Sequence, residues 1–349
     1  MKTVLIGRTS EELAQITRGL NLQAYRTDQL MDWMYRQRVD DFEQMTNLPL
    51  DLRSQLDERF RVCDMKVLQH RIGEEGTEKF AFTLRDGEVI ETVIMRYEHG
   101  VSLCLSTQVG CAMGCPFCAT GAGGLVRNLS RPEILGQWFL AQRRLDETGE
   151  RISHVVMMGM GEPLNNYEHS HRSLRLLHSE EGPGISYRRM TLSTVGITPR
   201  ILQLAEEDMP ITLAVSLHAP NDYLRDRLVP INREHPLSEL IPACELYAEH
   251  SGRRVSFEYA MMKGVNDHPE LARELGVLLG DMTCHINLIP FNPVPGVDYE
   301  PSPLEAVRKF RDVLSMVGLS VTIRRPLGLE IDAACGQLRR HLGAEDAVT

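Results

Sequence analysis

The chain has 349 residues, of which 42% are hydrophobic and 25% are charged, and this composition is typical of a globular protein with a sizeable core. The formal net charge of −10 disfavours loose binding of nucleic acid over the whole surface, but it does not exclude a local basic cleft. There is no apolar run of about 18 residues, so we expect no transmembrane helix. The N-terminal apolar run ends at Arg8, which is too early for a secretory signal, and we expect a cytoplasmic protein.

The N-terminal part of the chain has a helical pattern. Leu30, Trp33 and Met34 have the i, i+3, i+4 spacing that places side chains on one helix face. An Asn-Leu-Pro sequence at 47–49 interrupts this pattern before it resumes. We therefore predict a small helical domain over residues 1–62.

The next segment has the character of β-structure. Two short runs, KFAFTL and EVIETVIMRY, lie on either side of Asp86-Gly87, and this dipeptide is typical of a hairpin turn. We predict a β-rich extension over residues 63–100, which connects the helical domain to the rest of the chain.

Beyond residue 100, apolar or β-branched runs alternate with segments of helical composition. The runs cover residues 101–107, 152–158, 189–194, 211–217, 254–262, 284–291 and 320–325. Strands that alternate with helices indicate parallel βαβ units, so we predict an α/β domain of barrel or open-barrel type.

Unusual clusters of glycine and polar residues follow these runs. In chain order they are the cysteine loop 111–118, GMGEPLNN, STVG, SLHAPND, KGVND, PFNPVPG and, soon after the last run, DAACGQL. The active site of a parallel α/β barrel is built from the loops at the C-terminal ends of its strands. Because the clusters occur in register with the strands, we predict a functional site at that face.

The cysteine loop contains Cys111, Cys115 and Cys118 in a C-x3-C-x2-C pattern. A structural zinc site needs a fourth ligand, which Cys104 or His99 could supply. A thiol redox pair would use only Cys-Pro-Phe-Cys and leave the first cysteine without a role, and three unrelated buried thiols are a further alternative. An iron–sulfur cluster is normally held by four thiolates, so three of them leave one iron open to bind another group.

The C-x3-C-x2-C pattern after the first strand resembles the radical S-adenosylmethionine superfamily, in which the open iron binds the amino and carboxylate groups of S-adenosylmethionine. Further motifs together resemble the RlmN/Cfr family: LCLSTQVGCAMGCPFCATG, RNLSRPEI, VVMMGMGEPLNN, LSTVGITP, SLHAP, FNP and IDAACGQL. The resemblance covers nearly the whole chain. It implies a partial (β/α)6 TIM-like barrel of the radical S-adenosylmethionine type over residues 101–343, and a 4Fe–4S cluster held by Cys111, Cys115 and Cys118.

The resemblance also implies an activity, the methylation of an sp2 carbon of adenosine in 23S ribosomal RNA and, for some members, in transfer RNA. Such a carbon is a poor nucleophile, and radical chemistry on a methyl group carried by the protein removes that obstacle. The family pattern places the carrier at Cys335, which one S-adenosylmethionine methylates while a second is cleaved to a 5′-deoxyadenosyl radical. Cys104 matches the cysteine that resolves the resulting crosslink through a transient disulfide with Cys335, and Glu91 matches the proton acceptor.

These three residues also have plain structural interpretations. In an apolar strand Cys104 is typical of a small buried hydrophobe. Cys335, after two alanines, fits a tight helix start packed in the core, and Glu91 fits a solvated strand residue.

The resemblance further implies a set of S-adenosylmethionine contacts. A carboxylate in GMGEPL pairs well with the ammonium of the methionine moiety, although a plain glycine-rich turn is the alternative. The implied contact residues are Gly161, Glu162, Ser193, Ser216, Leu217, His218 and Asn292.

Two departures leave the target atom open. The ATG element after the third cysteine is closer to Cfr-like sequences, and the segment PFNPVPGVDYEPSP differs from the RlmN pattern. We expect methylation at carbon 2, with carbon 8 as the alternative.

The rival function classes are a radical enzyme with another substrate and a zinc-stabilised RNA-binding module. The partners implied are RNA and an electron donor such as flavodoxin or ferredoxin, with no membrane, and we expect a monomer.

Overall fold

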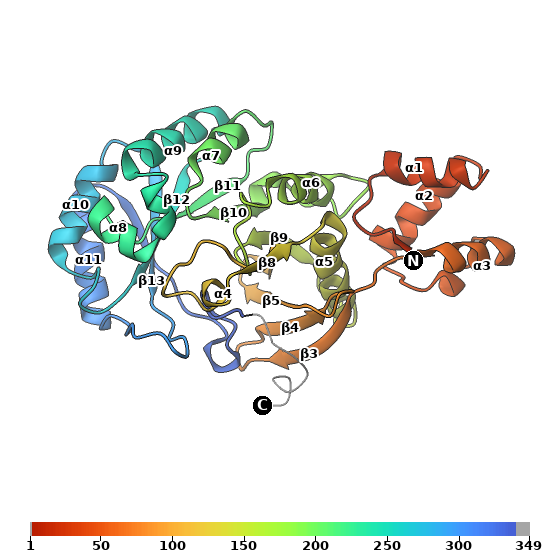
Figure 1. The fold of residues 1–349 in the computed structure, drawn as a ribbon, viewed down its shortest axis with the longest axis horizontal. Coiled ribbons are helices and arrows are strands. Elements are labelled where there is room, and N and C mark those ends of the chain that lie inside the picture. The colour runs from red at the N-terminus through yellow and green to blue at the C-terminus, as the bar shows by residue number, and fades with distance from the viewer. Residues whose placement is uncertain (1, 340–349) are drawn as a thin grey trace.

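The computed structural model describes residues 2–339, and a ten-stranded sheet forms its centre (Figure 1). The strands follow the order β14-β13-β12-β11-β10-β9-β6-β5-β4-β3. The first seven in this order are mutually parallel, and each matches one of the predicted runs. Their bounds are β6 (Gly100–Cys104), β9 (Ile152–Met157), β10 (Met190–Thr194), β11 (Thr212–Ser216), β12 (Val255–Met261), β13 (Cys284–Pro290) and β14 (Ser320–Ile323).

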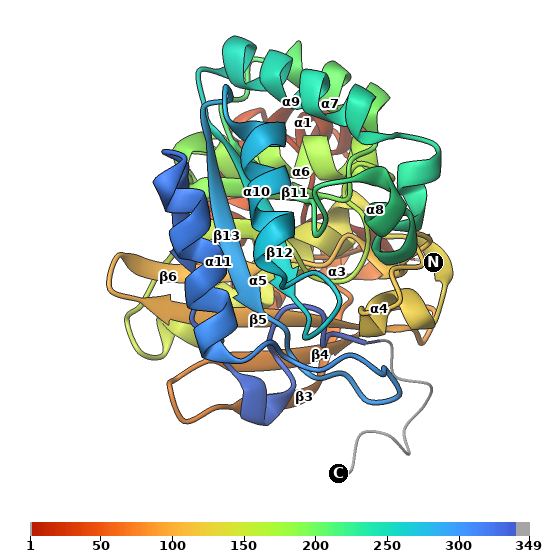
Figure 2. The same cartoon turned by 90° about the vertical axis from the view of Figure 1, so that its left-hand side faces the viewer.

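Six long helices connect these strands in turn, which confirms the predicted (β/α)6 arrangement with β14 as a closing strand. They are α5 (Arg131–Asp146), α6 (Tyr167–His178), α7 (Thr198–Ala205), α9 (Leu237–Ser251), α10 (Pro269–Leu279) and α11 (Leu304–Met316). The helices cover the outer face of the curved sheet, and Figure 2 shows α10 and α11 lying over β12 and β13. Their apolar faces and the strand side chains form one continuous hydrophobic core. Two shorter helices, α4 (Ala119–Ala122) and α8 (Asp222–Leu228), lie within loops.

The predicted β extension continues the barrel sheet instead of forming a separate layer. It consists of β3 (Lys66–Ile72), β4 (Glu78–Thr83) and β5 (Val89–Tyr97), and β5 pairs antiparallel with β6. The turn at Asp86-Gly87 connects β4 to β5 as expected, and Gly87 has a φ of +87°, a conformation that glycine adopts without strain. The extension therefore lies directly beside the first barrel strand.

The N-terminal helices stand to one side of the barrel in Figure 1. They are α1 (Ser10–Gly19), α2 (Tyr25–Met31) with a π-helical continuation (Asp32–Arg36), and α3 (Leu50–Arg59). The helical run ends earlier than its sequence pattern indicates, because Arg38 has a φ of +54°. A short strand pairing that the sequence did not predict, β1 (Thr3–Val4) with β2 (Phe60–Arg61), joins the two ends of this part of the chain.

Contacts with α5 attach the N-terminal helices to the barrel. The rings of Tyr35 and Trp138 lie 6.0 Å apart, and Arg38 Nε lies 2.5 Å from Asp146 Oδ2. No helix within residues 2–339 is long and apolar enough to cross a membrane. The division at residues 62 and 100 remains a prediction, and residues 340–343 of the predicted barrel domain lie outside the described part of the chain.

Candidate functional site

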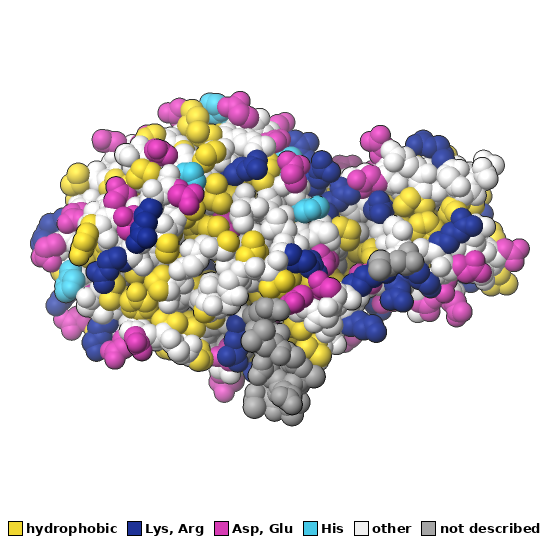
Figure 3. Space-filling view, in the orientation of Figure 1, with side chains coloured by type: hydrophobic (Ala, Val, Ile, Leu, Met, Phe, Trp, Pro, Cys, Tyr) yellow, Lys and Arg dark blue, Asp and Glu magenta, His cyan; other side chains and the backbone are white. Residues whose placement is uncertain are grey.

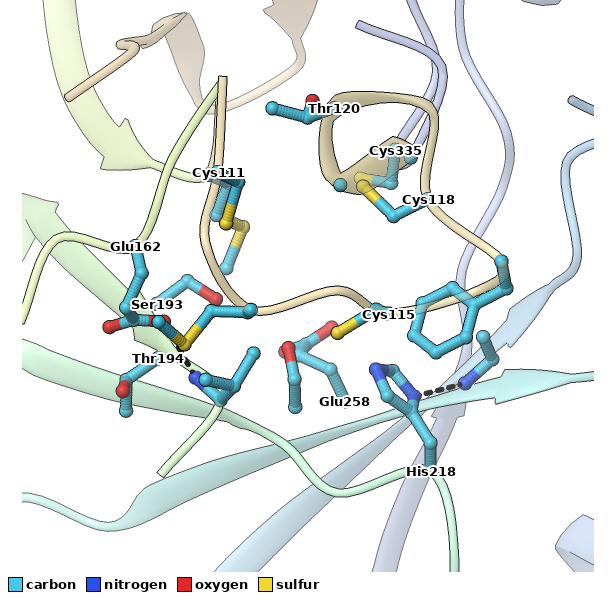
Figure 4. A pocket seen from close by; sticks show the side chains of 18 of the residues that line it. Cys111, Cys115, Cys118, Thr120, Glu162, Ser193, Thr194, His218, Glu258 and Cys335 are labelled. Atoms are coloured by element: carbon cyan, nitrogen blue, oxygen red, sulfur yellow. Dashed lines mark hydrogen bonds between the residues drawn. The ribbon is translucent and has the colours of Figure 1, made fainter. Parts of the chain in front are cut away.

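The three cysteines of the C-x3-C-x2-C pattern line one cavity at the C-terminal ends of the barrel strands (Figure 4). A hairpin formed by β7 (Gln108–Gly110) and β8 (Leu125–Asn128) closes the loop that carries them. The backbone N–H of Cys111 donates to Gly124 O at 2.9 Å, and that of Cys118 donates to Cys115 O at 3.1 Å. The loop therefore has its own backbone hydrogen bonds, and its thiols remain directed to the cavity.

Six of the seven predicted S-adenosylmethionine contacts line the same cavity. They lie at the ends of β9, β10, β11 and β13, and they are Gly161, Glu162, Ser193, Ser216, His218 and Asn292. Leu217 differs, because its side chain is part of the hydrophobic core and does not line the cavity. Its backbone N–H donates to Glu258 O at 3.0 Å.

Glu162 is the buried carboxylate of this cavity. Its oxygens accept hydrogen bonds from the backbone N–H groups of Leu164 at 3.0 Å and Val195 at 2.9 Å. Burial nevertheless raises the pKa of Glu162 to about 7, while these backbone donors lower it. A cationic ligand group beside the carboxylate would offset the cost of burying its charge.

Gly161 is needed for Glu162 to reach this position. Its φ is +103°, and a Cβ at this residue would lie 2.5 Å from the Cβ of Gln108. The side chain of Gln108 in turn accepts a hydrogen bond from the backbone N–H of Glu162 at 2.8 Å. The glycine allows this close approach of the two loops.

Replacing Gly161 with alanine is therefore expected to destabilise the protein by about 2–4 kcal/mol, through backbone strain combined with overpacking. Gly184 is a matched control, because its φ is also positive, at +70°, but a Cβ added there would meet open space, with no non-neighbouring atom within 4 Å. Alanine at Gly184 should cost only about 1 kcal/mol. Urea unfolding of the two variants measures the difference, and equal losses would contradict the steric argument.

His218 lines the cavity as an uncharged side chain. Its φ is +58°, and its Nδ1 accepts a hydrogen bond from the backbone N–H of Ala260 at 3.0 Å. Burial lowers the pKa of His218 to about 3, and Arg225 lowers it further. The ring also meets Phe117 edge-on, with 4.9 Å between centroids. The imidazole is therefore uncharged at neutral pH and serves for packing and hydrogen bonding.

A second cavity lies beside the first, and it is lined by Cys104 and Cys335. Burial raises the pKa of Cys104 to about 12; the nearby Cys335 raises it further, and Arg324 lowers it. The two cavities share five lining residues, and Cys335 is one of them. The structure thus brings the predicted carrier and the predicted resolving cysteine to one cavity, and the same carrier to the cavity of the three cysteines.

Hydrogen bonds to the backbone carbonyls of Cys335 and Gly336 hold Cys335 in place. Its carbonyl accepts a hydrogen bond from Asn292 Nδ2 at 3.0 Å, and the carbonyl of Gly336 accepts one from the backbone N–H of Ala119 at 2.9 Å. Gly336 has a φ of +85°, which turns the chain at this point. The segment after the last strand is thereby attached to the loop that carries the cysteine pattern.

Glu91 lies apart from these residues. It is 1% exposed on β5, and its Oε1 lies 3.0 Å from Lys79 Nζ. Its Oε2 accepts a hydrogen bond from the backbone N–H of Arg339 at 2.9 Å. Within residues 2–339 Glu91 lines neither cavity. The alternative interpretation of Glu91 as a solvated strand residue is wrong, because the carboxylate is buried.

Two charged residues of the site were missed by the sequence analysis. Arg324 lines both cavities, and Glu258 lines the first, with 4.0 Å between Arg324 Nη1 and Glu258 Oε2. The nearby Cys335 raises the pKa of Arg324. The available signals were a carboxylate, Glu258, within the predicted run 254–262 and an arginine, Arg324, within the run 320–325, since charges are rare in buried strands.

The residues that line the cavity offer soft ligands and polar groups to a cofactor. Cys111, Cys115 and Cys118 supply thiols, the ligands that iron–sulfur clusters use. Within the described residues, no three His, Cys, Asp or Glu side chains gather closely enough to hold a single metal ion. Glu258 Oε2 is buried in the same cavity and accepts no hydrogen bond in the described part of the chain, so it can receive a donor from a ligand.

Comparison with known proteins places this chain in a class. Residues 105–275 match the radical SAM superfamily, and residues 3–62 match a ribosomal RNA large subunit methyltransferase N-terminal domain. A crystal structure of a radical SAM methyltransferase from Sphaerobacter thermophilus superposes with a TM-score of 0.95 at 45% identity, and the match covers 97% of this chain and 99% of that one. The chain has the fold of a radical S-adenosylmethionine methyltransferase, a class that uses a 4Fe–4S cluster and S-adenosylmethionine.

Curated relatives narrow the class to a family. The probable dual-specificity RNA methyltransferase RlmN of Desulforamulus reducens is 50% identical, over 95% of this chain and 94% of its own length. The protein of the same name from Bacillus subtilis is 46% identical, over 94% and 91%. The chain belongs to the RlmN family.

Proposed function

We propose that this enzyme methylates an sp2 carbon of adenosine in RNA, with Cys335 as the carrier of the methyl group. The observation that carries the proposal is the position of Cys335, which lines both the cavity of the three cysteines and the cavity of Cys104. A carrier must receive a methyl group at one place and be released from its product by a second thiol, and this residue borders both.

The first cavity serves cofactor binding in this proposal. Cys111, Cys115 and Cys118 would hold the 4Fe–4S cluster with one iron open, and Glu162 would pair with the ammonium of S-adenosylmethionine. When bound, the cluster and S-adenosylmethionine supply a 5′-deoxyadenosyl radical. Glu258 would accept a hydrogen bond from the ligand, and the neutral His218 would pack against it without adding charge.

The remaining steps belong to protein side chains. The thiolate of Cys335 would take a methyl group from one S-adenosylmethionine, which leaves as S-adenosylhomocysteine. That methyl group would lose a hydrogen atom to the 5′-deoxyadenosyl radical, and its carbon would bond to the adenine. Glu91 would take the proton from the substituted carbon while one electron returns to the cluster, which restores the aromatic ring. The thiolate of Cys104 would then attack the sulfur of Cys335 and break its bond to carbon; the released carbon would take a proton, and the electron donor would reduce the resulting disulfide. Because Glu91 is covered by Arg339 in this structure, its proposed step requires the segment around Cys335 to move.

The substrate we propose is an adenosine of 23S ribosomal RNA, methylated at carbon 2, together with transfer RNA. Curated relatives carry the name dual-specificity RNA methyltransferase, which supports more than one RNA substrate. On the face seen in Figure 3, Lys and Arg side chains are interspersed with Asp and Glu, so binding would depend on local contacts instead of a broad basic field. A cytoplasmic location, a monomeric state and an electron donor such as flavodoxin or ferredoxin complete the proposal.

Nucleoside mass spectrometry tests the target. Ribosomal and transfer RNA from cells with and without this gene should differ in 2-methyladenosine, which should be lost with the gene. A loss of 8-methyladenosine instead would favour the carbon 8 alternative. RNA that is unchanged in both nucleosides would overturn the proposed substrate.

The carrier role makes its own prediction. After incubation with S-adenosylmethionine and a reductant, the peptide that contains Cys335 should gain the mass of one methyl group, because a thiolate in this cavity is the proposed methyl acceptor. Peptide mass spectrometry measures this gain, and the peptide of Cys244, a buried thiol outside both cavities, is the internal control. An unmodified Cys335 peptide would contradict the carrier role.

A further inference from the structure

The segment from Asp332 to Arg339, which carries Cys335, is attached to two parts of the molecule. On the barrel side, Gln337 Nε2 donates to Pro293 O at 3.0 Å, and Thr120 Oγ1 donates to Leu338 O at 2.5 Å. These contacts add to those of Asn292 and Ala119 described above. In Figures 1 and 2 the same segment, drawn in dark blue, also lies beside β4 of the β extension.

On the extension side, the two ends of the segment meet one ion pair. Lys79 Nζ donates to Asp332 O at 3.1 Å, and Glu91 Oε2 accepts from the backbone N–H of Arg339 at 2.9 Å. Lys79 and Glu91 are themselves joined at 3.0 Å, with side chains that are 6% and 1% exposed. One buried pair therefore contacts both the first and the last residue of the eight-residue segment.

The local geometry of the sheet explains this arrangement. Glu91 on β5 is directly opposite Ala81, so Lys79, two residues before Ala81 on β4, is its diagonal neighbour on the same face. Asp332 has a φ of +53°, so the chain turns sharply where its carbonyl reaches Lys79. Neither contact of the pair with the segment is needed for the pairing of β4 with β5, which uses backbone hydrogen bonds.

A buried ion pair is a weak source of stability, because desolvation of the two charges offsets most of their attraction. The Lys79–Glu91 pair has a more specific consequence in this fold, since it fixes both ends of a segment that lacks regular structure around its turn at Gly336. We propose that this pair is a clamp that holds residues 332–339 in place and so positions Cys335 at the junction of the two cavities. Lys79 is then a positioning residue.

The clamp also connects the two proposed roles of Glu91. While the Glu91 carboxylate accepts the hydrogen bond from Arg339, the segment covers the carboxylate, and Glu91 lines neither cavity. Release of the segment would remove the Arg339 contact from the carboxylate, which stays paired with Lys79. The proton acceptor would therefore become accessible only when the segment that carries Cys335 moves, and this consequence rests on the proposed function.

Amide hydrogen exchange of the cluster-loaded full chain tests the clamp. The variant Lys79→Met/Glu91→Met replaces both members of the pair by apolar side chains of similar length, so neither charge of the pair is left without the other, and the barrel should stay folded. The peptide that contains residues 332–339 should exchange about ten- to a hundredfold faster than in the parent, the effect of losing two hydrogen bonds to the segment. Exchange in β12 and the thermal midpoint should stay at the parental values.

The pair Lys309–Glu305 on α11 provides a control for the loss of an ion pair as such, because its atoms lie 2.8 Å apart and its side chains are 65% and 79% exposed. The variant Lys309→Met/Glu305→Met should leave exchange of residues 332–339 unchanged. Segment exchange within about twofold of the parent in the Lys79/Glu91 variant, or an equal increase in β12, would overturn the clamp.

A second readout separates positioning from mere attachment. In the Lys79→Met/Glu91→Met variant, methylation of Cys335 by S-adenosylmethionine should fall at least about tenfold while cluster iron is retained. Methylation at the parental level in a loosened segment would overturn the positioning role. A parent protein that never methylates Cys335 would instead overturn the proposed carrier, and the exchange experiment would still decide the clamp.

Discussion

Replacing Cys118 with alanine is expected to remove the cluster and all cleavage of S-adenosylmethionine. The three thiols of the pattern line one cavity and come from a single loop, and a cluster already left with one open iron cannot lose a further protein ligand without losing its attachment. We expect RNA methylation to fall by about a thousandfold or more, equivalent to about 4 kcal/mol of transition-state stabilisation. Iron analysis, the visible absorbance of anaerobically purified protein and 5′-deoxyadenosine formation measure the three consequences.

The control for this experiment is another cysteine of the same barrel. Cys284 is buried at the start of β13 and lines neither cavity, so alanine there should cost about 1 kcal/mol of stability and leave the iron content unchanged. Iron retained at the parental level in the Cys118→Ala protein would contradict the ligand assignment. A colourless parent protein containing zinc would overturn the cluster itself.

The fold was largely predictable because its signals are local. Each parallel strand is a short apolar run, and each is followed by a glycine or polar cluster that lies at the catalytic face. The hairpin at Asp86-Gly87 was readable from the turn chemistry alone. The pairing of β1 with β2 could not be predicted, because each strand contributes only two residues and all the N-terminal helices lie between them in the chain.

The parts of the site that depend on distant contacts could not be predicted. No spacing along the chain connects Lys79 to Glu91 or either of them to the segment of Cys335, because a diagonal cross-strand contact and an irregular loop bring them together. The burial of Glu91 could likewise not be predicted from the sequence, since an acidic residue in an alternating strand is usually solvated. Leu217 was expected from the family resemblance as part of the run Ser216 to His218, but its side chain packs into the core.

The second large effect is expected at Cys104. If this thiol resolves the crosslink between Cys335 and the adenine, alanine at this position stops the reaction after the carbon–carbon bond has formed, and the enzyme remains covalently attached to its RNA. The two cysteines line the same cavity, which supports a direct attack of one sulfur on the other. Purified Cys104→Ala protein should therefore carry nucleic acid that resists denaturant and is trimmed by ribonuclease, and its multiple turnover should be abolished.

Two further variants isolate the chemistry from the packing. Cys244 is buried, as Cys104 is, and burial also raises its pKa, but it lines neither cavity. Cys244→Ala should therefore lose a similar amount of stability and form no adduct. The double variant Cys104→Ala/Cys335→Ala should also be free of RNA, because the attachment point is gone. Normal turnover by Cys104→Ala would show that the residue is structural, and an adduct that persists in the double variant would show that the crosslink forms through another residue.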